Sequence, residues 1–90
     1  MRALFKPSFR KEFAALEPEI RHRVAGFCLD IIPEMTSPLD LFKYGAKKLA
    51  GWRGYFRIRI GDYRIGFKVE NSTVLFMHVL HRKEIYKHFL

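Results

Sequence analysis

The stretch from Tyr55 to Val69 constrains the fold more than any other part of this 90-residue chain. Apolar and polar residues alternate on both sides of Gly61-Asp62, which is the pattern of two half-buried strands joined by a hairpin turn. A two-residue loop that begins with glycine suits a type II′ turn, because glycine accepts a positive φ angle. This turn predicts a register in which the facing residues are Ile60 and Tyr63, Arg59 and Arg64, Ile58 and Ile65, Arg57 and Gly66, and Phe56 and Phe67.

The predicted register gives the hairpin one basic face and one apolar face. Arg57, Arg59, Arg64 and Lys68 share the basic face, and no acidic residue joins them. Arg59 and Arg64 are directly opposite, where like charges destabilise a sheet. A solvated outer face would explain one arginine, but three arginines without a counter-charge favour a binding site for a polyanion. The apolar face consists of Phe56, Ile58, Ile60, Tyr63, Ile65 and Phe67.

Length and composition indicate one folded domain, residues 1–90. Hydrophobic residues make up 49% of the chain and aromatic residues 16%, a content that excludes a disordered protein. Cys28 is the only cysteine and cannot form an internal disulfide, as is usual in a reducing compartment. The sequence has neither an apolar run long enough to span a membrane nor the pattern of a signal peptide, so we expect a cytoplasmic protein.

The net charge of +8 is concentrated in the second half of the chain. Residues 47–90 hold ten Lys and Arg against three Asp and Glu, whereas residues 1–46 hold seven against six. The half that contains the hairpin should therefore attract either the phosphates of a nucleic acid or an acidic protein, and charge alone does not distinguish the two.

The remaining segments predict an α+β fold with the order β-α-α-β-β-β(-α). We expect a first strand at 3–6, a helix capped by Ser8, and a second helix from Pro18 to about Pro33. A last strand at 74–80 should follow a turn at 70–73. The helices should form a hairpin on one face of a four-stranded, mostly antiparallel sheet. The apolar face of the hairpin around Gly61-Asp62 should pack against Phe9, Phe13, Val24, Phe27 and Ile31.

Other segments carry weaker signals. Turn-forming residues make 33–45 a connection, with room for one helical turn. We expect Trp52 to anchor the core rather than to stack on a base. The apolar strand 74–80 should be covered on both faces, which makes His78 a structural residue. Residues 83–90 should form a short amphipathic helix with Ile85 and Phe89 on one side.

Taken together, these features resemble the RelE/ParE superfamily of bacterial and archaeal toxins. The resemblance runs from Leu4 to Tyr86 and is most specific in the turn 61–64 and the run 81–86. It implies a type II toxin–antitoxin system, in which the toxin is a ribosome-dependent mRNA endoribonuclease. The 70S ribosome and mRNA would be its targets, and an acidic antitoxin its inhibitor. One alternative is a ParE-like inhibitor of DNA gyrase that acts by protein–protein binding, and another is a non-catalytic RNA-binding module.

The resemblance also implies roles for individual residues. Arg57 and Arg59 occupy the positions of a basic pair, and Arg64 occupies that of a phosphate-binding arginine. Arg82 corresponds to the residue that protonates or stabilises the leaving group, and Tyr86 to an aromatic residue that stacks on a base beside the cut. Further RNA contacts are expected from Lys47, Lys48, Arg53, Lys68 and Lys83.

The general base is where the sequence departs from the family pattern. Some members carry a lysine or a carboxylate where this chain has Arg59, and arginine is a poor proton acceptor. Histidine titrates near neutral pH, so His81, next to Arg82, is a candidate unless it points away from it. Alternatively, the ribosome positions the 2′-OH well enough that charge stabilisation suffices. We expect no metal ion or other cofactor, because the histidines and Cys28 lack zinc-site spacing.

Overall fold

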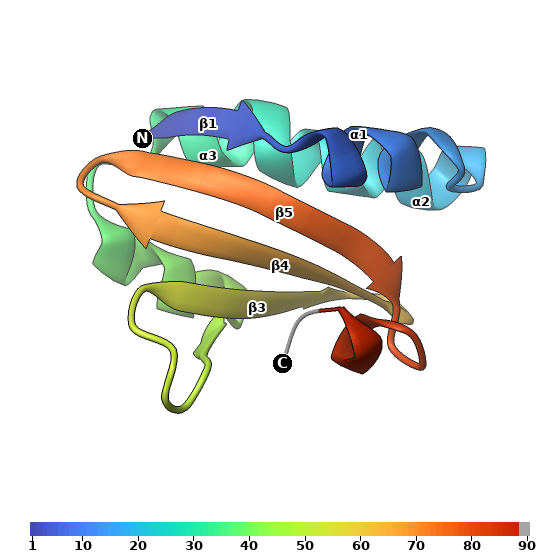
Figure 1. The fold of residues 1–90 in the computed structure, drawn as a ribbon. Coiled ribbons are helices and arrows are strands. Elements are labelled where there is room, and N and C mark those ends of the chain that lie inside the picture. The colour runs from blue at the N-terminus through green and yellow to red at the C-terminus, as the bar shows by residue number, and fades with distance from the viewer. Residues whose placement is uncertain (89–90) are drawn as a thin grey trace.

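The hairpin around Gly61-Asp62 forms as predicted in a computed structural model, which describes residues 1–88 (Figure 1). Strand β3 (Tyr55–Ile60) pairs antiparallel with β4 (Tyr63–Glu70), and all five predicted residue pairs are present. Gly61 has a φ angle of 59°, whereas Asp62 is not among the residues with positive φ. This combination fits the type II′ turn, so the sequence-based register is confirmed.

The hairpin lies within a mixed five-stranded sheet in the order β1-β5-β4-β3-β2. Strand β5 (Thr73–His81) pairs antiparallel with β4, and β1 (Arg2–Phe5) pairs parallel with β5. The predicted α+β order is confirmed. The sheet has one strand more than predicted, because the two-residue β2 (Lys47–Lys48) extends it beyond β3. A strand of two residues has no alternation to detect in the sequence.

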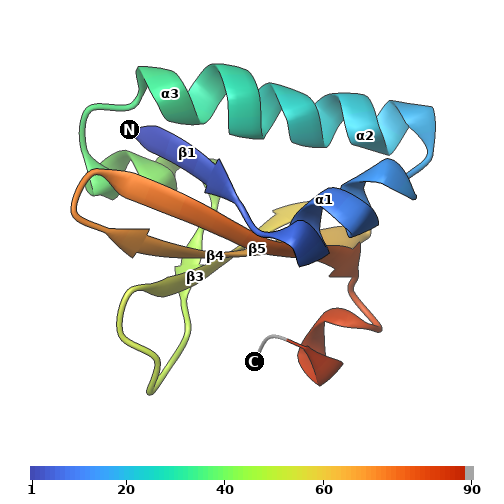
Figure 2. The same ribbon diagram turned by 45° about the horizontal axis from the view of Figure 1, so that its top comes forward.

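Helices cover one face of this sheet (Figure 2). Helix α1 (Pro7–Ala14) is followed by a long helix built from α2 (Pro18–Ala25), a π-helical segment η1 (Gly26–Ile31) and α3 (Ile32–Glu34). This helix ends at Glu34, one residue beyond the predicted end at about Pro33. Pro33 stands in the first turn of α3, where the missing N–H of a proline is tolerated, and the helix ends after Glu34.

The core lies between the long helix and the apolar face of the hairpin. Ile58 and Ile65 are buried while Arg59 is exposed, which confirms which face of the hairpin meets the helices. Ile32 is fully buried, whereas Ile31, the predicted core residue, is only half-buried. The π-helical segment accounts for this difference, because its wider turns change which residue faces the sheet in the turn that follows.

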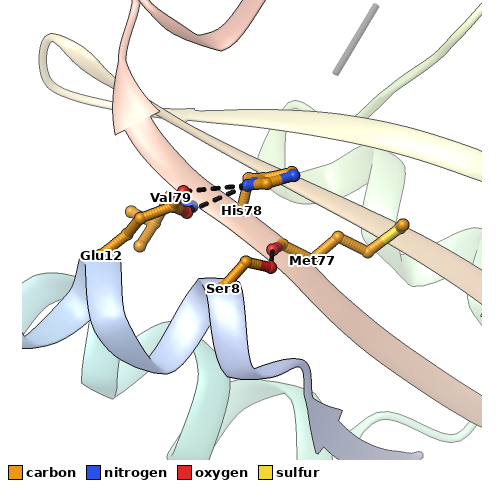
Figure 3. A network of polar contacts seen from close by, with 5 residues as sticks. All are labelled: Ser8, Glu12, Met77, His78 and Val79. Carbon is orange, nitrogen blue, oxygen red and sulfur yellow. Dashed lines mark hydrogen bonds and ion pairs between the residues drawn. The ribbon is translucent and has the colours of Figure 1, made fainter. Parts of the chain in front are cut away.

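Helix α1 completes the outer edge of β5, where β1 ends (Figure 3). Ser8 does not cap the helix, since Lys6 is the N-cap residue; its hydroxyl donates instead to the Met77 carbonyl at 2.7 Å. A Glu12 carboxylate oxygen accepts the Val79 backbone N–H at 3.0 Å, and Glu12 also contacts Nδ1 of His78 at 3.0 Å. The prediction of a structural His78 is confirmed.

Other segments differ from the prediction. The connection after Pro33 contains a 3-10 helix, η2 (Pro38–Tyr44). Residues of β5 alternate between buried and half-buried, so only one face of this strand is fully covered. The C-terminal segment contains a short 3-10 helix, η3 (Ile85–Lys87), with Ile85 fully buried; Phe89 lies outside the described residues.

Trp52 is not the core anchor that the sequence favoured, because 50% of its surface is exposed. It lies in the loop between β2 and β3, which projects from the sheet on the side away from the long helix (Figure 2). Among residues 1–88, none of the helices is long and apolar enough to cross a membrane.

Candidate functional site: the arginine hollow

Arg57, Arg59 and Arg64 line one hollow of about 490 Å³ on the open side of the hairpin. We call it the arginine hollow. The first two arginines come from β3 and the third from β4, and the sheet register places them on the same face. Its other lining residues are Lys47 of β2, Tyr44 and Gly45 at the end of η2, and Tyr86 of η3.

Like charges face each other twice within this hollow. Arg59 is paired with Arg64 across β3 and β4, and Lys47 is paired with Arg57 across β2 and β3. The residues that line the hollow include no carboxylate. Within the described part of the chain, none of the ion pairs involves an arginine. Binding of an anion would therefore relieve repulsion that the protein itself leaves uncompensated.

Arg64 is the most constrained of the three arginines. Its Nη1 donates to the carbonyl oxygens of Gly61 at 3.2 Å and Tyr63 at 3.0 Å, which ties the guanidinium to the turn. Burial, followed by the charge of Arg59, lowers the pKa of the Arg64 guanidinium below its ordinary value. The charges of Arg57 and Arg82 act in the same direction. Partial burial is therefore the main cause of the lowered pKa, and the neighbouring arginines add to it.

Tyr86 stands over the arginine hollow with half of its surface exposed. The Arg57 guanidinium carbon lies 5.0 Å from the centroid of its ring, within the range of a cation–π interaction. The neighbouring Ile85 is fully buried and η3 packs on β5, so the ring is carried by an anchored segment. An aromatic side chain in this position can stack on a nucleobase.

Arg82 lies next to the arginine hollow without lining it. Its backbone N–H donates to the Asp62 carbonyl at 2.8 Å, so the residue is held beside the hairpin turn while its side chain is exposed. The family resemblance assigns Arg57, Arg64 and Arg82 to one site, so their guanidinium groups are expected in one concavity. The structure brings the first two together there, and Arg82 acts on the site through its charge, which reaches Arg64.

His81 points away from the arginines. It pairs with Tyr63 across β4 and β5, and the two rings lie 5.6 Å apart, on the face that packs against the helices. Its Nδ1 accepts the backbone N–H of Lys83 at 3.2 Å. The proposed role of His81 as the general base therefore does not fit this geometry, because neighbouring residues of a strand point to opposite faces of the sheet.

The lysines and arginine predicted to contact RNA divide into separate groups. Lys47 lines the arginine hollow. Lys83 is exposed beyond the end of β5 and lines neither the arginine hollow nor the second hollow described next. Lys48, Arg53 and Lys68 surround a second hollow of about 990 Å³ beside the loop of Trp52. We call it the loop hollow.

Sequence reasoning missed Tyr44, Gly45 and Glu12. The first two lay inside a segment interpreted only as a connection, although Gly45 is the natural end of a short helix and has a φ angle of 84°. Glu12 had no signal in the sequence, because its partners Val79 and His78 are more than 60 residues away.

Comparison with known proteins identifies the family of this chain. Residues 3–86 match the family model described as the ParE toxin of the type II toxin–antitoxin system parDE. Toxin RelE3 of Methanocaldococcus jannaschii is 37% identical over 89 residues, which is 99% of each chain. The chain belongs to the RelE/ParE toxin family. The family model and the full-length similarity to a RelE toxin together make this chain a type II toxin–antitoxin toxin of the RelE family.

Solved structures of this toxin family share the fold. The toxin in the RelB–RelE antitoxin–toxin complex from Methanococcus jannaschii superposes with a TM-score of 0.79 at 36% identity, covering 97% of this chain and 99% of that one. The isolated RelE toxin of E. coli gives a TM-score of 0.67 at 17% identity, covering 99% and 98% of the two chains. At 17% identity the second likeness shows the fold alone.

Proposed function

We propose that this RelE-family toxin is a metal-independent endoribonuclease that cuts mRNA on the ribosome. The observation that carries the proposal is the arginine hollow, where three guanidinium groups and Lys47 converge without a carboxylate among the lining residues. Guanidinium groups pair with phosphate oxygens two at a time, so this arrangement suits a phosphate that gains charge during a reaction.

The proposed reaction is attack of a ribose 2′-OH on the adjacent phosphorus. The 2′-oxygen loses its proton and bonds to phosphorus, and the bond from phosphorus to the 5′-oxygen breaks. The 5′-oxygen takes up a proton, which leaves a 2′,3′-cyclic phosphate and a 5′-hydroxyl. In our proposal Arg57, Arg59 and Arg64 stabilise the charge on the phosphorane, and Arg82 stabilises the leaving oxygen from its place beside the turn.

The lining of the arginine hollow contains no histidine, and His81 faces the helices. We therefore propose that the reaction depends on alignment and charge rather than on a dedicated base within the hollow. Holding the 2′-OH in line with the scissile bond can remove about 7–11 kcal/mol of a barrier. A hollow that is open on one side is suited to a substrate positioned by a second body, and the 70S ribosome would supply that body.

The other proposed partner is an acidic antitoxin. The related toxins from M. jannaschii and E. coli have been solved in complex with RelB. For this chain, we propose that an acidic segment of its antitoxin neutralises the basic half of the protein and blocks the arginine hollow, either directly or by displacing the segment from Lys83 onwards.

The test is to express the toxin in cells and map the 5′ ends of mRNA with and without translation. New 5′ ends with a 5′-hydroxyl should appear within translated frames and disappear when translation is blocked. The Arg64→Ala variant should lose this cleavage. Lys11→Ala, which removes one positive charge from an exposed position on α1, should retain it. Absence of translation-dependent ends with the intact toxin would overturn the proposal.

A second candidate function is inhibition of DNA gyrase, favoured by the match of residues 3–86 to the ParE model. It requires no phosphate-binding hollow. Gyrase supercoiling assays with the purified toxin separate the two functions. If the toxin inhibits gyrase, and if Arg64→Ala and Arg82→Ala both remain toxic in cells, the gyrase function replaces the nuclease.

A further inference from the structure

Trp52 is the only tryptophan in the chain, and its ring is presented to solvent by an ordered loop. The backbone N–H of Trp52 donates to the Leu49 carbonyl at 3.1 Å, and the backbone N–H of Tyr55 donates to the Trp52 carbonyl at 3.1 Å. Gly51 and Gly54 on either side have φ angles of 79° and 81°, so the loop turns sharply at both positions. The backbone is thus fixed in a shape that leaves a large apolar ring exposed.

Three hollows adjoin one another through shared aromatic residues. Tyr86 lines both the arginine hollow and a middle hollow of about 400 Å³. Trp52 lines this middle hollow and also the loop hollow. Tyr55 also lines the middle hollow, and its ring centroid lies 5.8 Å from that of Trp52 in an edge-on arrangement. Tyr55 is two residues from Arg57 on the same face of β3. That separation is about 7 Å along the strand.

The charges around Trp52 are suited to phosphate. Lys48, Arg53 and Lys68 line the loop hollow together with a single carboxylate, that of Glu70. Lys68 pairs with this carboxylate at 3.3 Å. Lys48 and Arg53 take part in none of the ion pairs of residues 1–88. The loop hollow therefore keeps a net positive charge beside an exposed aromatic ring.

We propose that Trp52 is a stacking platform for a base of single-stranded RNA, with Lys48 and Arg53 holding the adjoining phosphates. The RNA would run from the arginine hollow past Tyr86 and the middle hollow to this loop, so Trp52 binds a nucleotide that flanks the cut. Basic side chains that follow the backbone, combined with exposed rings for the bases, are the usual means of binding single strands. An acidic peptide would satisfy the cations but would not require an exposed ring on a fixed loop.

This inference rests on the proposed function only in taking RNA as the ligand, and it can be tested without cleavage. Because Trp52 is the only tryptophan, the tryptophan fluorescence of the protein reports on this residue alone. We expect an unstructured oligonucleotide with 2′-O-methyl groups, which has no 2′-OH to attack, to quench this emission in low salt. Inorganic polyphosphate, which carries charge without bases, should leave the emission unchanged. Equal quenching by polyphosphate would overturn stacking.

Variants test the same inference by the affinity for a fluorescently labelled 2′-O-methyl oligonucleotide. Trp52→Ala should weaken binding about 5- to 150-fold, which corresponds to the loss of one base stacked on an aromatic ring. Trp52→Phe should recover most of the loss. Leu39→Ala, a control at an exposed apolar side chain of η2 outside all three hollows, should bind as tightly as the parent. Thermal unfolding verifies that each variant is folded.

The outcomes separate this inference from the nuclease. Quenching by the oligonucleotide in a toxin that does not cut mRNA would support Trp52 as an RNA site and reject the nuclease. Efficient cutting together with unchanged binding by Trp52→Ala would reject the Trp52 site alone. Quenching by an acidic antitoxin segment but by no oligonucleotide would assign the loop to a protein partner and overturn the inference.

Discussion

Arg59 and Arg64 show how one residue pair can serve a site at the expense of the fold. They oppose each other across two strands, and burial together with this opposition lowers the pKa of Arg64. Opposed like charges carry a cost in the stability of a sheet. The hydrogen bonds from Arg64 to the turn carbonyls recover part of that cost. In the proposed function, this pair forms an anion site that is complete only when a phosphate is bound.

Replacement of Arg64 by alanine should separate activity from stability. We expect cleavage to fall by about 10²–10³-fold, as for removal of one donor to a transition-state oxyanion. The free energy of unfolding should stay the same or rise slightly, because the repulsion with Arg59 is lost. Arg64→Lys should keep the stability of the parent but recover only part of the activity, because a lysine cannot form the paired contacts of a guanidinium. Urea unfolding and cleavage rates measure both, and a clearly less stable alanine variant would contradict the argument.

Helix α1 acts on the sheet as an element, through the outer edge of β5. Strand β1 pairs with β5 only as far as Phe76, and the Ser8 and Glu12 side chains then satisfy backbone groups of Met77 and Val79 (Figure 3). A strand edge covered in this way does not offer its N–H groups to another chain. Side chains of a helix therefore replace a strand where the sheet would otherwise be open.

The Glu12→Ala variant tests this edge. It leaves the N–H of the buried Val79 and the half-buried His78 ring without their carboxylate partner, so we expect a loss of about 1–3 kcal/mol in unfolding free energy. Glu12→Gln keeps an oxygen acceptor and should lose less. Denaturant unfolding compares the two, and hydrogen exchange at the Val79 amide should accelerate in the alanine variant. Equal stability of both variants and the parent would show that α1 does not support this edge.

The loop that presents Trp52 offers a matched pair of glycines. Both have positive φ angles, so alanine at either position should cost on the order of 1–2 kcal/mol. A Cβ at Gly54 would also lie 3.0 Å from the Val69 carbonyl oxygen, whereas a Cβ at Gly51 would meet nothing within 4 Å. Gly54→Ala should therefore be less stable than Gly51→Ala in urea unfolding. The reverse order would mean that the loop does not hold the shape described.

In the molecule as a whole, the excess positive charge and most of the strands belong to the second half of the chain, and the α-helices belong to the first half. Residues 47–90 carry ten Lys and Arg against three Asp and Glu, and they provide four of the five strands. The α-helices α1, α2 and α3 come from the nearly neutral first half, and Figure 2 shows them on the side of the sheet away from the C-terminal segment and the loop of Trp52. The helical layer supports one side of the sheet, and the arginine hollow lies on the other side.

This separation predicts a strong salt dependence of RNA binding. Each phosphate contact with a single strand contributes a slope of about −0.7 to the plot of log affinity against log salt, because bound counterions are released. Arg53→Ala should reduce the steepness by about one such contact. Lys11→Ala, on the helical side, should leave the slope unchanged. An affinity that does not change with salt would mean that the basic side of the sheet is not the docking surface.

The sequence alone determined the hairpin and the arginine face. Alternation on both sides of Gly61-Asp62 left one register in which the apolar residues share a face, and that register brought Arg57, Arg59 and Arg64 together. Residues close in the sequence and a two-residue turn are sufficient to set this register. A slip of one residue would move every apolar side chain to the wrong face of the sheet.

Tertiary structure decided where the isolated residues point. His81 faces the helices because β5 pairs with β4 in one register, and Trp52 is exposed because the loop at 49–54 closes on its own backbone away from the core. Strand β2 likewise exists only through its pairing with β3, and the Glu12 contacts depend on partners that are distant in the sequence. Local patterns carry no information about such partners, because the contacts exist only after the chain has closed on itself.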